Sequence, residues 1–300
     1  MSRVSIGLPV YNGERFLSAS MDSLLAQTFR DFELVISDNA STDATGEICR
    51  AYAERDRRVR YVRSEQNIGS APNFNRVVQL SNAPYFTWAA HDDVRAPRFL
   101  ERCVEKLDRD PSVVLAYTRG SVIDESGDHV RDFCEGPDLL SPSPYERLHR
   151  WLFQPHVAYH AFFGVIRTPV LAQALPLANC AGNDELFLAH VVLLGKYYEV
   201  PELLFFNREH RARASTAYVG VEQSLWFDPG NRGKVPIPRT RRIVGWLRAV
   251  MSAPMSPADR ARCLVLVARY AHWYSRLLAV ETWQSSRHWA ARLLGARRGR

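Results

Sequence analysis

Two adjacent carboxylates, Asp92 and Asp93, follow His91 at the end of a short apolar stretch. Residues 85–90 before them are typical of a buried strand, so both acidic side chains are expected at a strand end. Adjacent carboxylates repel each other, and a divalent cation is the usual means of relieving that repulsion. The sequence therefore predicts a cation site where this strand ends.

Polar residues follow two other predicted strands in the same way. Tyr11-Asn12 comes after residues 3–10, and Asp38-Asn39 comes after residues 32–36. In parallel α/β sheets, ligands bind beyond the carboxyl ends of the strands, so these groups should meet at one rim. Turn and cap preferences of Asn and Asp are the alternative explanation for each of them.

The elements that must position these residues alternate between strand and helix. Apolar runs predict strands over 3–10, 32–36, 59–62 and 85–90. Helical periodicity predicts a helix through residue 25 with Asn12 as N-cap, one through residue 53 capped by Ser41 or Thr42, and one over 74–80. This alternation indicates a right-handed parallel α/β sheet.

Further elements extend this first part of the chain. We expect a helix over 99–107, a strand over 113–117, a loop over 133–144, a helix from Ser143 or Pro144 to 153, a strand over 162–166, and a helix over 184–194 ended by Gly195. Residues 197–206 contain Pro201 and read as an edge strand. The predicted organisation is a domain over 1–227, a linker over 228–240 rich in Gly and Pro, and a basic helical segment over 241–300 with helices at 242–251 and 257–280.

Composition excludes several classes of protein. With 46% hydrophobic and 24% charged residues, the 300-residue chain is neither disordered nor fibrous, and no apolar run approaches the length of a spanning helix. The five scattered cysteines suggest reduced thiols, and the first residues lack a secretory signal, so we expect a cytoplasmic protein. Dinucleotide, phosphate-loop, GxSxG and HExxH motifs are all absent from the sequence.

Charge is unevenly distributed along the chain. Residues 239–300 hold 13 arginines, no lysine and two acids, a balance of +11 that leaves −4 for the rest of a chain of net charge +7. Arg262, Arg269 and Arg276 recur every seven residues, and Trp273, Trp283 and Trp289 lie among them. An anionic membrane is one explanation for this pattern; packing on the catalytic domain, a homodimer contact or a solvated helical face are the others.

Four segments together resemble the family-2 glycosyltransferases of the GT-A fold: VSIGLPVYNGERFL, FRDFELVISDNASTDAT, NIGSAPNFNRV and FTWAAHDD. The resemblance covers about residues 3–216, in order. It implies a GT-A type nucleotide-binding sheet with flanking helices, followed here by the C-terminal helical extension. It also implies a nucleotide-diphosphate sugar donor, a divalent cation, and inverting transfer to a hydroxyl acceptor, in cell-surface glycan or polysaccharide synthesis. The acceptor would be a glycan or lipid-linked, and no nucleic-acid partner is expected.

The resemblance assigns the acidic residues to the metal and the donor. Asp93 would coordinate Mg²⁺ or Mn²⁺, and Asp92 would hold ribose or sugar hydroxyls. His91 replaces the first acid of the family's triplet, and we expect it to be packed rather than to bind metal. His210 matches a position that in some relatives contacts the metal or the diphosphate.

The same resemblance places the nucleotide at the first two strand ends. Asp38 would accept the imide N–H of uracil or thymine, although Asn39 stands where the family often has a second acid, which leaves the base open. Tyr11 would stack on the base. Other residues implied in donor binding are Pro9, Val10, Glu14, Asn67, Gly69 and Asn73; for Val10 and Glu14, an ordinary strand end and helix start are the alternative.

The predicted catalytic base lies in the later segment CAGNDELFLAH. Asp184 matches the acid that deprotonates the acceptor hydroxyl in the family, and Glu185 is the fallback. Acids at a helix start are also favoured by the helix dipole alone. No covalent intermediate is required, so no activated Ser or Cys is expected.

Two functions from other classes compete with this one. A nucleotidyltransferase that makes the sugar nucleotide would use a similar sheet and metal, but it usually carries a Gly-rich basic N-terminal loop that Tyr11-Asn12-Gly13-Glu14 does not provide. A non-catalytic nucleotide-sugar or membrane-docking module is the other alternative. It would be favoured if Asp184 were remote from the donor site.

Overall fold

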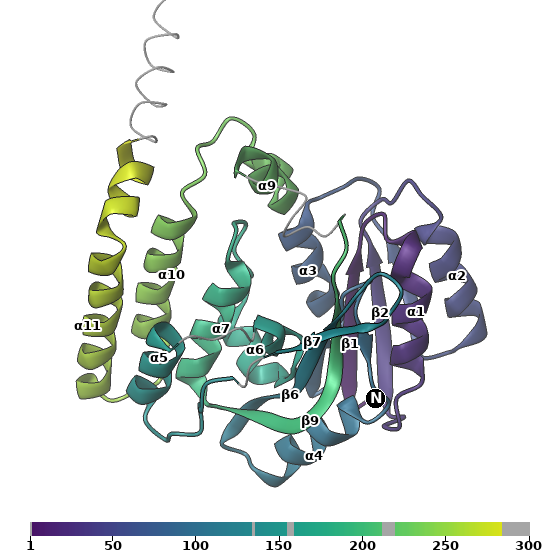
Figure 1. Ribbon diagram of the computed structural model, residues 1–300, viewed down its shortest axis with the longest axis horizontal. Coiled ribbons are helices and arrows are strands. Elements are labelled where there is room, and N and C mark those ends of the chain that lie inside the picture. The colour runs from purple at the N-terminus through teal and green to yellow at the C-terminus, as the bar shows by residue number, and fades with distance from the viewer. Residues whose placement is uncertain (1, 134–135, 155–158, 212–219, 284–300) are drawn as a thin grey trace, which may run out of the picture.

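The computed structural model describes residues 2–133, 136–154, 159–211 and 220–283, and within them one mixed sheet forms the centre of the molecule (Figure 1). The strands are β1 (Val4–Val10), β2 (Phe32–Asp38), β3 (Val59–Arg63), β4 (Tyr85–Trp88), β5 (Val94–Arg95), β6 (Val113–Ile123), β7 (His129–Asp132), β8 (Val165–Arg167) and β9 (Lys196–Arg208). Their order is β3-β2-β1-β4-β8-β6-β9-β5, with β7 paired to β6.

The four N-terminal strands are mutually parallel, as the sequence predicted. β1 pairs with both β2 and β4, and β2 pairs with β3. Every residue of β1 is buried, which explains why its sequence VSIGLPV is almost continuously apolar rather than alternating. The carboxyl ends of β1 to β4 therefore lie along one edge of the sheet.

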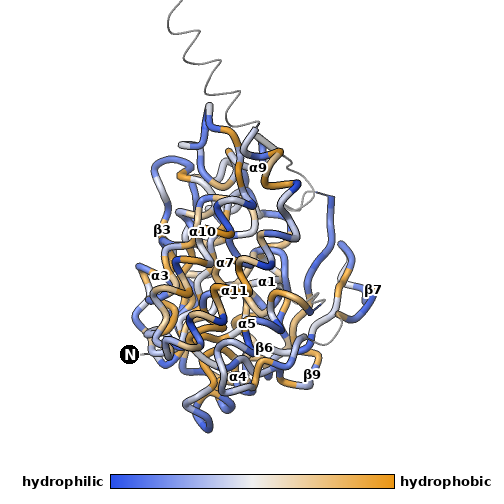
Figure 2. Tube along the Cα trace, turned by 90° about the vertical axis from the view of Figure 1, so that its left-hand side faces the viewer, coloured by the Kyte–Doolittle hydropathy of each residue, from blue (hydrophilic) through white to orange (hydrophobic). Residues whose placement is uncertain are grey.

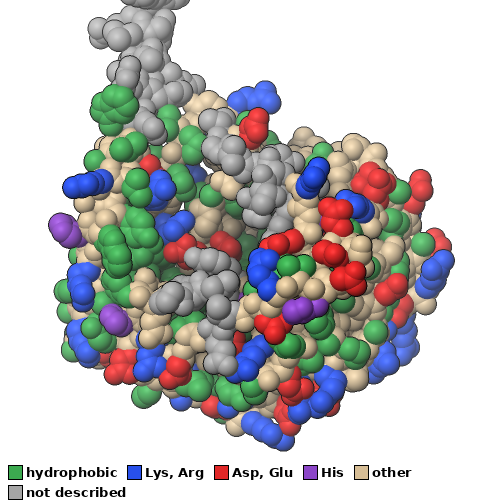
Figure 3. All heavy atoms as spheres, viewed as in Figure 1, with side chains coloured by type: hydrophobic (Ala, Val, Ile, Leu, Met, Phe, Trp, Pro, Cys, Tyr) green, Lys and Arg blue, Asp and Glu red, His purple; other side chains and the backbone are tan. Residues whose placement is uncertain are grey.

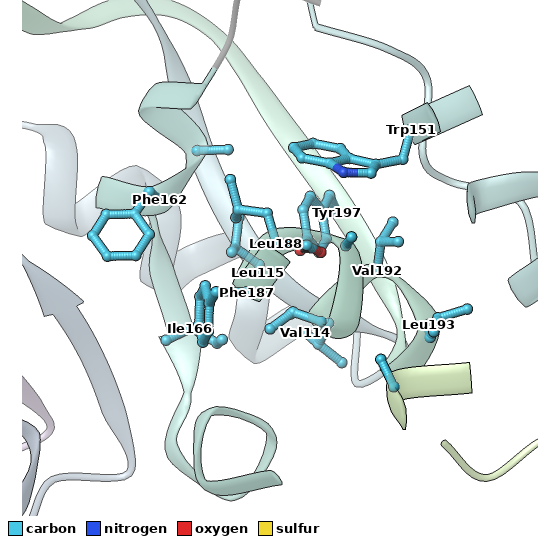
Figure 4. Packing of buried hydrophobic residues seen from close by; sticks show 14 of the residues in the cluster. Val114, Leu115, Trp151, Phe162, Ile166, Phe187, Leu188, Val192, Leu193 and Tyr197 are labelled. Atoms are coloured by element: carbon cyan, nitrogen blue, oxygen red, sulfur yellow. Dashed lines mark hydrogen bonds between the residues drawn. The ribbon is translucent and has the colours of Figure 1, made fainter. Parts of the chain in front are cut away.

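Helices cover both faces of the sheet. They are α1 (Glu14–Leu25), α2 (Thr45–Arg55), α3 (Ser70–Gln79), α4 (Phe99–Arg109), α5 (Pro144–Phe153), α6 (Thr168–Ala174), α7 (Asn183–Leu194), α9 (Gly220–Phe227), α10 (Pro238–Ser252) and α11 (Pro257–Trp273). One hydrophobic cluster joins the sheet to α1, α2 and α4. A second joins it to α3, α5 and α7, where Phe187, Leu188 and Val192 interlock with sheet residues (Figure 4).

The N-termini of α1 and α2 are capped differently from the prediction. Asn12 is not the N-cap of α1; Gly13 is, and Asn12 adopts a φ of 51° so that its Oδ1 accepts the Thr42 N–H at 2.8 Å. Neither Ser41 nor Thr42 caps α2, because the helix starts later, at Thr45. The Ala44 N–H instead donates to Glu14 Oε2 at 2.9 Å. The two turns cap each other across the sheet edge, an arrangement that local sequence rules do not encode.

The prediction of an edge strand over 197–206 is wrong. β9 lies inside the sheet, between β6 and β5. The pairing with β6 runs from Val200 opposite Thr118 directly to Leu203 opposite Arg119, which leaves Pro201 and Glu202 in a bulge. A bulge tolerates proline because the missing N–H is not needed there. The predicted strand 162–166 is likewise replaced by a 3-10 helix, η1 (Tyr159–Phe163), followed by β8.

The C-terminal helices pack against the sheet domain. α10 lies on α7, α11 lies on α5 and α10, and a break at Tyr274 separates α11 from a further helical stretch over 275–283 (Figure 1). Trp246, Val250, Leu266 and Val267 belong to the same hydrophobic cluster as α7. The division of the chain at 228–240 stays a prediction. Among the described helices, none has both the length and the apolar character needed to cross a bilayer.

Candidate active site

The carboxyl edge of the parallel strands brings the predicted polar groups together. Val10 at the end of β1 is in register with Asp38 at the end of β2, and the Asn39 N–H donates to the Val10 carbonyl at 2.9 Å. β4, on the other side of β1, leads into His91, Asp92 and Asp93. Viewed as in Figure 1, the surface is hollowed between the C-terminal helices on the left and the sheet on the right, and acidic side chains gather around the hollow (Figure 3).

Asp93 is fixed by the end of β9. Its side chain is only 5% exposed, and its Oδ1 accepts hydrogen bonds from Asn207 Nδ2 at 2.8 Å and from the Arg208 N–H at 3.0 Å. The Arg208 guanidinium donates to the Asp92 carbonyl at 3.0 Å and to the carbonyls of Asp124 and Glu125. The carboxylate orientation is thus set by a segment more than a hundred residues away in the sequence.

Asp92 pairs with the predicted histidine. Its Oδ2 lies 2.9 Å from His210 Nε2, and the His210 ring packs 4.8 Å from the Phe16 ring. Burial acts to raise the pKa of Asp92, but the hydrogen bond to His210 and the nearby His91 and His210 rings outweigh it and lower that pKa. Asp92 is accordingly held as a carboxylate.

The residues present fit a divalent cation. Among the described residues, no group of three or more His, Cys, Asp and Glu side chains is arranged as a ready-made metal cage. Magnesium, however, is commonly held by one or two carboxylates together with substrate phosphates. Asp92 and Asp93 supply the carboxylates, and His210 Nδ1 is buried with no hydrogen-bond partner beside them. This donor set suits Mg²⁺ or Mn²⁺ bound jointly with a diphosphate.

His91 is packed, as expected, rather than aimed at the carboxylates. A Cβ atom on Gly13 would lie 2.7 Å from the His91 ring and 2.8 Å from Val10 Cγ2. The glycine therefore allows the His91 ring to close over the turn after β1. Replacement of the first acid by histidine is compatible with a packing role.

Asp38 is fully buried and surrounded by donors. Its Oδ1 accepts from the Ser41 N–H at 2.8 Å, and its Oδ2 accepts from the Tyr61 hydroxyl at 2.8 Å and from Arg63 at 2.7 Å. The Tyr61 pKa is raised to about 12 by burial and by this hydrogen bond to Asp38. Arg63, with 43% of its side chain exposed, is the member of this cluster that faces outward. Base reading by Asp38 remains a prediction, and Arg63 extends the candidate base site.

Three asparagines hold the loop that precedes α3. Asn39 Nδ2 donates to Asn67 Oδ1 at 2.9 Å and to the Gly69 carbonyl at 3.2 Å, while its Oδ1 accepts from the Ile68 N–H. Asn73 is buried and bonds to the hydroxyl and the carbonyl of Ser37. These amides bond within the protein, so we interpret Asn39 and Asn73 as residues that shape the donor site.

The remaining predicted donor residues differ in exposure. Pro9 and Val10 are buried in β1, whereas the Tyr11 side chain is 39% exposed and presents an aromatic ring at the sheet edge. Glu14 caps α2, as described above. Of this group, Tyr11 is the residue best placed for stacking on a base.

The candidate base lies at the N-terminus of α7. Gly182, at φ 76°, is the N-cap residue, and Asp184 and Glu185 occupy the first turn. Asp184 Oδ1 accepts from the Glu185 N–H at 2.9 Å. Burial raises the pKa of Asp184 more than this bond and Arg242 lower it, and burial likewise raises the pKa of Glu185. A carboxylate with a raised pKa is suited to accept a proton near neutral pH.

Helix α10 clamps the loop that carries these acids. Arg242 lies 2.8 Å from Glu185 Oε2, and Arg241 donates to the Asn179 carbonyl at 3.0 Å. A side chain on Gly182 would collide with Arg242, since a Cβ there would lie 2.5 Å from its guanidinium. The C-terminal helices are therefore part of the architecture around the candidate base.

The linker before α10 also contacts the donor-side loop. Asp228 Oδ2 accepts from Asn179 at 2.7 Å, and a Cβ on Gly69, whose φ is 92°, would lie 2.7 Å from the Phe227 carbonyl. Residues 227–229 thus touch both the loop before α3 and the loop before α7.

Sequence reasoning missed three groups around the site: Arg63, the Asn207-Arg208 pair, and Arg242. Arg63 could have been found, because it ends the third parallel strand in register with Asp38. Asn207-Arg208 lies just before His210 and could have been noted from that position. Arg242 carries no local signal, because its role depends on how α10 packs on α7.

Comparison with known proteins identifies the family. Residues 5–174 match the model of glycosyl transferase family 2. An uncharacterized glycosyltransferase of Methanocaldococcus jannaschii is 26% identical over 161 residues, which are 52% of this chain and 53% of that protein. The glycosyltransferase GlyG of Streptococcus pneumoniae is 30% identical over 137 residues, 45% of each chain. The chain thus spans about half the length of these curated relatives.

Solved structures show the same fold at low sequence identity. TarS 1-349 of S. aureus in complex with UDP-GlcNAc superposes with a TM-score of 0.66 at 18% identity, covering 92% of this chain and 74% of that one. The mannosyltransferase PcManGT of Pyrobaculum calidifontis, in complex with GDP-Man and Mn²⁺, has a TM-score of 0.52 at 17% identity, covering 96% of this chain and 83% of that one. The GT-A type fold predicted from the sequence is confirmed.

Proposed function

This chain belongs to glycosyl transferase family 2, and we propose that it is an inverting, metal-dependent enzyme that transfers a sugar from a nucleotide-diphosphate sugar to a hydroxyl acceptor. The observation that carries the proposal is the difference between its two acidic sites. Asp92 and Asp93 are held by β9 residues at the end of β4, while Asp184 is a buried carboxylate of raised pKa at the start of α7. Acids with such different environments suit different roles.

The metal side of the site concerns the leaving diphosphate. Asp93, with Asp92 and His210, would hold Mg²⁺ or Mn²⁺ together with the donor phosphates. When bound, such an ion stabilises the negative charge that develops on the leaving group. The support is the fit of the donor set described above and the Mn²⁺ named in the PcManGT complex. Arg208 and Asn207 would keep the Asp93 carboxylate in its orientation throughout.

The base side concerns the acceptor. Asp184 would take the proton of the acceptor hydroxyl as its oxygen attacks the anomeric carbon from the face opposite the diphosphate. A single displacement of this kind inverts the configuration and needs no covalent enzyme intermediate. Glu185, which is engaged by Arg242, is the second candidate for the base.

The nucleotide would occupy the ends of β1 to β3. Tyr11 would stack on the base, and Asp38 with Arg63 would contact its polar edge. Nucleotide sugars are the donors named for the structural neighbours, UDP-GlcNAc for TarS and GDP-Man for PcManGT. These two donors differ in both base and sugar, so we propose the class of donor and leave its base and sugar to experiment.

The acceptor class is proposed from the family resemblance. We expect a glycan or lipid-linked acceptor, and a cytoplasmic enzyme that acts in cell-surface glycan or polysaccharide synthesis. The open hollow beside the C-terminal helices in Figure 3 leaves room for an acceptor on the side of α7.

A test separates this function from its competitors. Purified protein is incubated with Mn²⁺ and a panel of UDP-, GDP- and dTDP-sugars, and the release of nucleoside diphosphate and of pyrophosphate is measured. A glycosyltransferase releases nucleoside diphosphate, and NMR of a transferred sugar reports inversion. Pyrophosphate formation from a sugar phosphate and a nucleoside triphosphate would support a nucleotidyltransferase instead. Donor binding without turnover over the whole acceptor panel would support a non-catalytic module.

A further inference from the structure

Exposed apolar side chains concentrate in the C-terminal helices. Eight of the twelve large hydrophobic side chains that are exposed in the described residues lie within 238–283, which is less than a fifth of the described chain. Large exposed apolar areas on a protein surface mark sites of interaction. The surface of α10, α11 and 275–283 therefore needs an explanation beyond packing on the catalytic part.

One face of this segment has a regular composition. Arginines 262, 269 and 276 alternate with Val265, Trp273 and Val280 at helical spacings of three or four residues, and Trp283 continues the series. All of these side chains are exposed; Trp273 is 73% exposed and Trp283 is 58% exposed. We call these seven residues the Arg–Trp face. Figure 2 views the molecule from the side on which α10 and α11 lie.

The apolar residues that the sequence pattern also offered for packing point elsewhere. Cys263, Leu266 and Val267 are buried in the cluster shared with α7. The part of the packing explanation that concerns the catalytic domain is thus satisfied by a different side of α11. The Arg–Trp face is left on the outside of the described residues.

The positive charge of this face is only weakly offset within the segment. Residues 238–283 contain eight arginines, no lysine and two acids. Glu281 is 4% exposed and caps α10 by accepting the N–H groups of Arg239 and Thr240. Asp259 accepts from the N-cap residue Ser256 and lies 4.0 Å from Arg262. Five more arginines follow in 284–300, outside the described residues.

Aromatic rings support two of the arginines. The Arg262 guanidinium lies 3.8 Å from the centroid of the Tyr145 ring, and that of Arg269 lies 5.5 Å from the Phe153 ring. Phe153, Arg269, Trp273 and Arg276 line a shallow groove of about 790 Å³ along α11. Guanidinium groups beside exposed aromatic rings match a surface that is anionic outside and apolar beneath.

We propose that the Arg–Trp face binds the anionic surface of a phospholipid bilayer and holds the enzyme peripherally on it. An amphipathic helix with arginines and tryptophans lies in the plane of the interface, with its aromatic rings at headgroup depth. A second copy of this chain fits less well, because a two-fold contact places the same face on both partners and brings like charges together. This inference does not depend on the transferase reaction, so its test needs no substrate.

The test uses the full chain and vesicles of defined composition. Protein is mixed with vesicles of pure phosphatidylcholine and with vesicles that contain phosphatidylglycerol, and bound protein is separated by flotation. We expect binding to the anionic vesicles alone, and its loss at high salt, since the attraction falls off within a Debye length. Binding to neither vesicle at low salt, or equal binding to both, would overturn the proposal.

Matched variants locate the contact. Arg269→Gln/Arg276→Gln should lower the partition coefficient on anionic vesicles about 30-fold, as two surface charges would. Arg55→Gln/Arg57→Gln makes the same change in net charge on α2, at the opposite edge of the molecule, and should change it less than about twofold. Equal loss in the two pairs would show that net charge alone acts and would sink the idea of a defined face.

The aromatic contribution has its own variant. Trp273→Ala/Trp283→Ala should weaken binding on the order of tenfold without lowering the melting temperature by more than a degree or two, because both rings are exposed. If the wild-type protein is instead a dimer by light scattering, ignores vesicles, and becomes monomeric in this variant, then the face is a subunit interface and the membrane proposal is wrong.

Discussion

Asp92 and Asp184 are both carboxylates in the candidate site, yet their surroundings favour opposite protonation behaviour. His210 beside Asp92 lowers the pKa of that carboxyl, which keeps it ionised and suited to electrostatic work. Burial at the start of α7 raises the pKa of Asp184, which suits it to take up a proton. The environment of each acid, rather than its type, separates the metal side from the base side.

Asp184→Asn should lose most of the transfer activity while donor and metal binding remain. A general base contributes about 10²–10⁴-fold to the rate, and an amide cannot accept the proton. The folded-state pKa of Asp184 lies above its unfolded value, so ionisation of this buried group destabilises the fold as the pH rises through that interval. The variant should therefore melt at the same or a higher temperature at pH 8. Unchanged kcat in Asp184→Asn, with a large loss in Glu185→Gln, would transfer the role to Glu185.

The raised pKa of Asp184 also predicts a pH dependence. The base acts only when deprotonated, so kcat should fall as the pH decreases through this raised pKa, at a higher pH than an ordinary aspartate would give. A pH profile of kcat under saturating donor and acceptor measures this acidic limb. A flat profile down to pH 4 would contradict the assignment.

Asp93→Asn should abolish transfer and weaken metal-dependent donor binding. The amide keeps an oxygen that can accept from Asn207 and from the Arg208 N–H, so the fold should be preserved. It loses the negative charge that attracts a cation. Titration calorimetry with Mn²⁺ and nucleoside diphosphate measures the binding, with the exposed Asp128→Asn as control. Wild-type transfer by this variant, or by the wild-type enzyme in excess EDTA, would refute the metal role.

At the level of elements, the sequence predicted what depends on periodicity and neighbours along the chain. The parallel order of β1 to β4 follows from alternating strands and helices, and the cap of α5 by Ser143 follows from local chemistry. Contacts between distant segments were not predictable. Glu14 caps α2, Asp93 is bonded by Asn207, and Pro201 sits in a bulge of an inner strand, because packing decides which segments meet.

Helix α10 provides the element-level prediction, through Arg242. Arg242→Met removes the partner of Glu185, whose side chain is 14% exposed, and should cost about 1–3 kcal/mol, less than for a fully buried pair because Arg242 is itself 23% exposed. Loss of its positive charge should also raise the pKa of Asp184 further, so the acidic limb of kcat should move to higher pH.

Two further variants make the Arg242 result specific. Arg242→Lys keeps the charge and should restore part of the pH profile, and Arg248→Met on the exposed side of α10 should match the wild type. If Arg242→Met and Arg248→Met have the same kcat and the same acidic limb, then α10 does not position the base.

The whole molecule is tied together by the second hydrophobic cluster. It contains β4 and β6 of the sheet, α7 with the candidate base, and Trp246, Leu266 and Val267 of the C-terminal helices. The family match ends at residue 174, so α7, α10 and α11 all lie beyond it. A chain built in this way should treat its C-terminal helices as part of one folding unit, although the sequence suggests a linker before them.

Trp246→Ala tests this unity, with Trp273→Ala as its matched control. Trp246 is 1% exposed within the shared cluster, and truncating a buried tryptophan costs about 3–5 kcal/mol. Trp273 is 73% exposed, so the same truncation there should change stability by less than about 1 kcal/mol. Unfolding in urea is followed by circular dichroism and by loss of nucleotide binding. Because the cluster spans sheet and helices, both signals should give one coincident transition, shifted to lower urea in Trp246→Ala alone. A separate early transition that leaves nucleotide binding intact would instead show that α10 and α11 unfold as an independent domain.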